Sequence, residues 1–83
     1  MKVLIDDTTY EGTAAEIVDR LRLRNDDRND YPDTESYIRQ LRSNFIRSIG
    51  EDCDLPKTGL ENRARVLLFR FADVGSLEVL ADE

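Results

Sequence analysis

The chain has 83 residues, of which 40% are hydrophobic and 36% are charged, with 18 acidic against 12 basic side chains. This length suits one hydrophobic core, so residues 1–83 are predicted to form a single compact domain. No apolar run exceeds four residues, which excludes a membrane span of about 20 apolar residues. The N-terminal residues become acidic at Asp6, too early for a secretory signal, and a cytoplasmic protein is expected.

The residue types present give little support to metal, nucleotide or nucleophilic chemistry. The chain has no histidine and one cysteine, Cys53, so the usual zinc and iron sites and an internal disulfide cannot be built from it. Cys53 lies between Asp52 and Asp54, whose negative charges disfavour the reactive thiolate. The glycines are isolated and match no phosphate-binding loop. We therefore predict no enzyme activity, no cofactor, no metal site and no catalytic residue.

The first 24 residues predict a β-hairpin followed by a helix. Met1–Ile5 is aliphatic, residues 6–8 have turn chemistry, and residues 9–11 favour a second short strand. Thr13 and Glu16 match a capping box, in which two side chains satisfy backbone donors at a helix start. Apolar residues at helical spacing then carry the helix to about Arg24: Ala14, Ile17, Val18 and Leu21.

A second helix is predicted over residues 34–49. It follows a loop over residues 25–33 that contains a proline and ends in Asp33, a favourable N-cap. The loop lacks the glycine and glutamate of a calcium-binding EF-hand, so a solvated acidic loop is favoured over a weak divalent site. One apolar face predicts contact with the core: Ile38, Leu41, Phe45 and Ile49.

A third helix is predicted over residues 60–74, after a second capping box at Thr58 and Glu61. Its main stripe is Leu60, Ala64, Leu67, Leu68, Phe71 and Val74. Val66 and Phe69 lie on another side, so the helix is apolar over more than half its circumference. Two interpretations stay open: the helix is covered on two sides within the monomer, or Val66 and Phe69 form a dimer or partner surface.

Residues 76–80 alternate apolar and polar side chains after Gly75, which favours a strand that pairs with the first. The three helices and two or three strands must share one core. We therefore predict an α+β fold, in which the N-terminal hairpin and the C-terminal strand form a small antiparallel sheet.

Charge is divided unevenly along the chain. The three predicted helices sum to +1, +2 and +1, which leaves −10 for the loops and termini. A net charge of −6 opposes nucleic-acid phosphates, so nucleic acid is not the expected partner. The connections also exceed the short turn of a helix-turn-helix. An accessory nucleic-acid role stays an alternative, because arginines could gather on faces of the second and third helices: Arg39, Arg42, Arg47, Arg63, Arg65 and Arg70.

The leading hypothesis is a non-catalytic acidic module that binds another protein, or a second copy of itself, and does not act at a membrane. One class within it is a small inhibitor or charge mimic carried by a phage or another mobile element. Tyrosine and arginine are favoured at interface centres. The predicted contact surface is therefore Tyr37, Arg39, Arg47, Arg63, Val66, Phe69 and Arg70.

Overall fold

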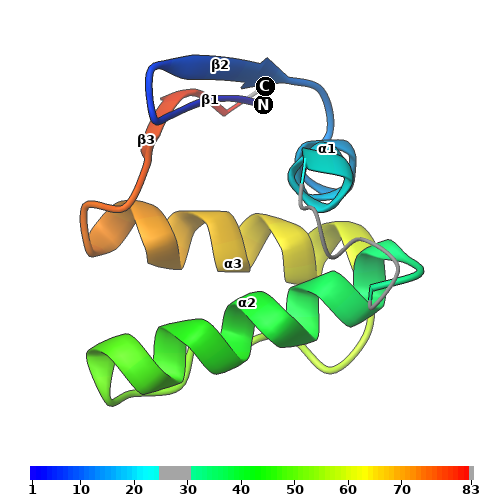
Figure 1. Cartoon of the computed structure of the whole chain (residues 1–83), viewed down its shortest axis with the longest axis vertical. Coiled ribbons are helices and arrows are strands. Elements are labelled where there is room, and N and C mark those ends of the chain that lie inside the picture. The colour runs from blue at the N-terminus through cyan, green and yellow to red at the C-terminus, as the bar shows by residue number, and fades with distance from the viewer. Residues whose placement is uncertain (25–30, 83) are drawn as a thin grey trace.

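In the computed structural model, which describes residues 1–24 and 31–82, the chain adopts an α+β fold (Figure 1). As predicted, the described residues form three helices and an antiparallel sheet. The predicted loop over 25–33, with its open question of a divalent site, lies mostly outside the described residues. In chain order the elements are β1 (Lys2–Ile5), β2 (Thr8–Glu11), α1 (Ala14–Arg24), α2 (Thr34–Ile49), α3 (Leu60–Asp73) and β3 (Glu78–Ala81).

The N-terminal hairpin and the C-terminal strand share one three-stranded sheet in the order β2-β1-β3. Val3, at the centre of the sheet, is fully buried and pairs with Tyr10 of β2 and Val79 of β3. Side chains alternate across a strand, so these three residues share the face that packs on the helices. The hairpin turn holds Asp6 and Asp7 at φ of 49° and 67°, a left-handed pair that asparagine and glycine adopt more readily.

The starts of α1 and α2 carry the predicted caps. Thr13 Oγ1 accepts a hydrogen bond from the Glu16 N–H at 3.1 Å, and the Thr13 N–H donates to the Glu16 carboxylate at 3.0 Å. At α2, the Asp33 carboxylate accepts from the Ser36 N–H at 2.8 Å, and Ser36 Oγ accepts from the Asp33 N–H. Both helices therefore begin where unpaired backbone donors find side-chain acceptors.

The predicted capping box at the start of α3 is wrong. The N-cap is Gly59 instead of Thr58, and no side chain caps it. The Glu61 carboxylate instead accepts from the backbone N–H groups of Ala14 and Ala15 at 2.8 Å each. The reason is that the first turn of α1 offers free donors and a positive dipole end to any carboxylate within reach. Glu61 thus joins α3 to the start of α1.

Helices α2 and α3 run in the same direction and lie side by side (Figure 1). The Glu35–Arg63 ion pair, at 2.9 Å, joins their first turns, and the Phe45 and Phe71 rings meet edge to face at 5.4 Å near their ends. Two consecutive helices can be parallel only if the chain travels back along them. Residues 50–59 do this, and we call them the return segment.

Helix α3 lies between the sheet and α2 and contacts all three neighbouring layers, α1, α2 and β3 (Figure 1). Because α3 has neighbours on more than one side, apolar residues around much of its circumference contact the core. The buried ones are Ala64, Leu67 and Leu68, and Phe69 and Phe71 pack against the same core. Among the described residues no charged side chain is fully buried. Within residues 1–24 and 31–82, no helix combines the length and apolar character needed to cross a membrane.

The end of α3 differs slightly from the predicted one. The helix ends at Asp73, and the Ser76 N–H donates to the Phe71 carbonyl at 2.9 Å. This bond wraps the following residues around the helix end, with Gly75 at a positive φ of 81°. The strand β3 therefore begins at Glu78, two residues after the predicted start.

Candidate functional site

Three residues of the predicted contact surface lie on α2, and they differ in exposure. Tyr37 is only 9% exposed and its ring meets Tyr31 edge to face at 5.5 Å. Arg39 and Arg47 are exposed. Tyr37 therefore belongs to the core, and only the two arginines offer a partner their full side chains.

The other four residues lie on α3, where three make specific internal contacts. Arg63 is paired with Glu35, and Phe69 is half-buried against the core beneath the Arg65 guanidinium, 5.2 Å from its ring centre. Val66 is half-buried. Arg70 is exposed, and its Nε donates to the Cys53 carbonyl at 3.0 Å. The seven predicted residues thus do not form one exposed surface.

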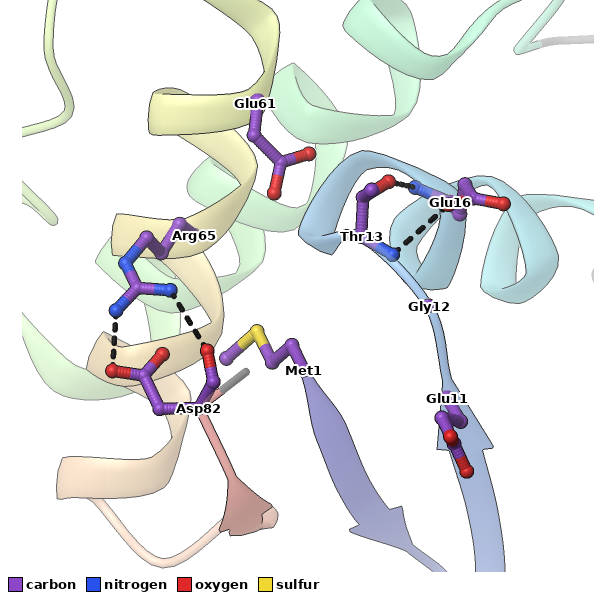
Figure 2. Close-up of a pocket in the computed structure, with 8 residues that line it drawn as sticks. All are labelled: Met1, Glu11, Gly12, Thr13, Glu16, Glu61, Arg65 and Asp82. Atoms are coloured by element: carbon purple, nitrogen blue, oxygen red, sulfur yellow. Dashed lines mark hydrogen bonds and ion pairs between the residues drawn. The ribbon is translucent and has the colours of Figure 1, made fainter.

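A hollow of about 480 Å³ lies where the sheet meets the starts of α1 and α3 (Figure 2). Most of its polar side chains are engaged with one another or with backbone. Thr13 and Glu16 bond reciprocally, Glu61 holds the first turn of α1, and Arg65 binds Asp82. The pKa of Glu16 is lowered because the Thr13 backbone and hydroxyl both donate to its carboxylate. The lining residues are Met1, Glu11, Gly12, Thr13, Glu16, Glu61, Arg65 and Asp82.

Two contacts join the starts of the three helices. Glu61 binds the first turn of α1, and the Glu35–Arg63 pair joins the first turns of α2 and α3. We call this region the capped end. A general acid or base needs a proton that it can exchange with a substrate. In the capped end the two glutamates are already engaged as acceptors, Glu61 by backbone N–H groups and Glu35 by a guanidinium group.

A second hollow, of about 210 Å³, is almost wholly apolar and lies where α1, α2, α3 and the sheet meet. It is smaller than the roughly 300–1,000 Å³ of small-molecule sites and brings no convergent polar groups to a ligand. Its lining residues are Ile5, Leu21, Tyr37, Leu41, Leu68, Phe71, Ser76 and Leu77.

A third feature lies where α2 and α3 end side by side. Ile46, Ile49 and Val74 are 38%, 43% and 40% exposed, and Ile49 and Val74 line one hollow of about 190 Å³. Ile46 lies one helical turn before Ile49, on the same side of α2. Carboxylates of the return segment and of the end of α3 surround them. We call this feature the helix-end surface and define it as Ile46, Ile49 and Val74 with Glu51, Asp54 and Asp73.

The neighbouring Asp52 is held in place by Arg42. The Arg42 Nε and Nη2 atoms donate to the two oxygens of Asp52 at 2.9 and 2.5 Å. This bidentate contact lowers the pKa of Asp52 to about 2. Next to it, Cys53 is fully buried, and burial raises the pKa of its thiol. The return segment is thus fixed to α2 through Asp52 and to α3 through the Cys53 carbonyl.

The arginines considered for nucleic-acid contacts are largely neutralised by the fold. Carboxylates pair with four of the six, in the pairs Arg42–Asp52, Arg63–Glu35, Arg65–Asp82 and Arg70–Asp73. Arg39 and Arg47 form no ion pair with a described residue. Across the described parts of the chain, no group of three Cys, Asp or Glu side chains could hold a metal ion.

Comparisons of the chain with protein-family models, with curated proteins and with solved structures found no match.

The sequence placed Ile49 and Val74 on core stripes and did not identify the helix-end surface. Both residues do continue those stripes, but they come about one helical turn after Phe45 and Phe71, whose rings contact each other, and they are exposed. One signal was available: each stripe ends next to acidic residues, Glu51 to Asp54 in one case and Asp73 in the other. That the two ends meet depends on the helices being parallel, which the pattern does not reveal.

Proposed function

We propose that this protein is a non-catalytic protein-interaction module and that the helix-end surface is its contact site. The observation that supports the proposal is the exposure of Ile46, Ile49 and Val74 at one end of the molecule. Burial of apolar surface contributes about 25 cal/mol per Å², so three aliphatic side chains left in water together are typical of a surface that another protein covers.

The other exposed large apolar side chains line none of the three hollows described above. Leu23, Leu60 and Leu80 lie on α1, α3 and β3 respectively, and each stands on a different element. Isolated apolar side chains on a surface are ordinary and carry no functional meaning. They are, however, useful controls for the helix-end surface.

The test compares three immobilised forms of the protein as baits in extracts of its native cell: wild type, the double variant Ile49→Gln/Val74→Gln, and the control variant Leu60→Gln. A protein that the wild type and the control capture, that the double variant does not, and that binds with defined stoichiometry after purification would support the proposal. Equal capture by all three baits, with circular dichroism showing all three folded, would overturn it.

A further inference from the structure

The helix-end surface has a strongly negative electrostatic environment, to which the backbone contributes. Each helix carries about half a negative elementary charge at its C-terminal end. In an antiparallel pair the opposite ends of the two dipoles would adjoin and offset one another. Here α2 and α3 are parallel and end together at Ile49 and Asp73, so their negative ends add (Figure 1).

Side chains increase this negative charge. Four carboxylates and one guanidinium line the hollow beside Ile49 and Val74. Arg42 neutralises one carboxylate, that of Asp52. The single lining cation, Arg70, is committed to the Cys53 carbonyl and is 3.8 Å from Asp73. Glu51, Asp54 and Asp73 are exposed around the aliphatic side chains, and their charge is only partly offset.

The hollow itself limits what can enter. Its volume of about 190 Å³ is below the roughly 300–1,000 Å³ typical of small-molecule sites, so it suits one side chain inserted from a larger partner. Its floor includes the buried ring of Phe45, an apolar base for an apolar insertion. Such anchors commonly carry much of the binding energy of an interface.

We infer that the occupant of the helix-end surface is a basic, amphipathic polypeptide segment, which inserts an aliphatic or aromatic side chain beside Ile49 and Val74 and places lysine or arginine near Glu51, Asp54 and Asp73. This inference rests on the proposed function and names the chemistry of the partner. A second copy of the chain is disfavoured, because a two-fold contact would oppose two acidic surfaces on molecules of net charge −6. The same repulsion disfavours nucleic acid and anionic lipid.

The experiment uses fluorescein-labelled synthetic peptides of about four helical turns. The first contains lysine and leucine with the leucines on one helical face, the second has each leucine replaced by alanine, and the third has each lysine replaced by glutamate. Fluorescence anisotropy gives the dissociation constant of each with the full-length protein at about 0.01 M and about 0.15 M ionic strength. Amide chemical shifts in an ¹⁵N-labelled sample locate the bound peptide.

Two matched pairs of variants separate a specific contact from general attraction to an acidic protein. Asp54→Asn/Glu51→Gln removes two charges at the surface, and Asp7→Asn/Glu11→Gln removes two charges on β2 and its turn. The pairs match closely, because Asp54 and Asp7 both have positive φ, 56° and 67°, which asparagine tolerates. Ile49→Gln is matched by Leu60→Gln at the other end of the helix pair.

We expect the lysine–leucine peptide to bind, and the alanine and glutamate peptides to bind at least about tenfold more weakly. Ile49→Gln and Asp54→Asn/Glu51→Gln should each weaken binding about five- to tenfold, with the controls within about twofold of wild type. Equal losses in both charge variants, or shifts located away from α2 and α3 ends, would overturn the inference. If no peptide binds but the Ile49→Gln/Val74→Gln bait still loses a partner, the proposed function stands and the basic character of the partner is wrong.

Discussion

The two ends of the α2–α3 pair differ in which groups are left exposed to solvent or without an internal partner. At the capped end, Glu61 binds two backbone N–H groups of α1, and Arg63 pairs with Glu35 across the helices. At the helix-end surface, Ile49 and Val74 remain in water among carboxylates. The same two helices therefore begin in a closed junction and end in an open surface.

The difference shows where the fold leaves interactions available to another molecule. A donor or acceptor already bonded inside the chain contributes little to a partner, because binding would only exchange one bond for another. An exposed aliphatic side chain gains by being covered. The contacts of the capped end thus stabilise the fold, whereas the exposed side chains of the helix-end surface remain available to a binding partner.

The largest effect is expected at the floor of the helix-end surface. Phe45 is 5% exposed and packs edge to face on Phe71. Phe45→Ala should lower the free energy of unfolding by about 3–5 kcal/mol through lost burial and the cavity left behind. Urea denaturation followed by circular dichroism measures it. A loss below about 1 kcal/mol would mean that the Phe45 ring is not part of the packed core.

At the capped end, Glu61→Ala should lower the free energy of unfolding by about 1–2 kcal/mol, because two charge-assisted bonds to the α1 backbone are lost. Glu78→Ala, an exposed carboxylate on β3, serves as the control and should change stability by less than about 0.5 kcal/mol. Similar values for the two variants would show that the Glu61 bridge does not close this end.

Acid should weaken the attachment of the return segment. The pKa of Asp52 is about 2 in the folded protein against an ordinary value of 3.8, so the unfolded chain takes up the proton first. Its stabilising contribution is present above about pH 4 and is lost as the pH falls toward 2. Melting temperatures measured from pH 5 to pH 2 should therefore fall less steeply in Asp52→Asn than in wild type; parallel curves would contradict the role of the Arg42 contact.

The smallest effects are expected for the exposed aliphatic side chains. Ile49→Gln and Val74→Gln should each change the free energy of unfolding by less than about 1 kcal/mol, as should Leu60→Gln near the capped end. Chemical denaturation of the three variants checks this. A loss of about 2 kcal/mol or more at Ile49 or Val74 would assign these residues to folding and remove the main support for a binding role.

Local signals allowed the sequence to predict most of the fold. The aliphatic first strand, the alternation around Val79, the Thr13–Glu16 box and the Asp33 cap act over a few residues, and each is found as expected. The contact surface was harder, because exposure depends on which elements meet. Arg63 is paired with Glu35 because α2 and α3 pack in parallel, and the Tyr37 ring is covered by Tyr31 from the segment that precedes α2.

The buried thiol of Cys53 allows the local opening of the return segment to be measured as a rate of thiol modification. A thiol without solvent access and with a raised pKa reacts with an alkylating reagent only during brief local opening. Since this is the single cysteine of the chain, its modification rate reports how often residues 50–59 lift from the two helices. A partner seated on neighbouring Asp54 and Glu51 would hold the segment down and slow that rate, so the native sequence contains its own reporter of occupancy.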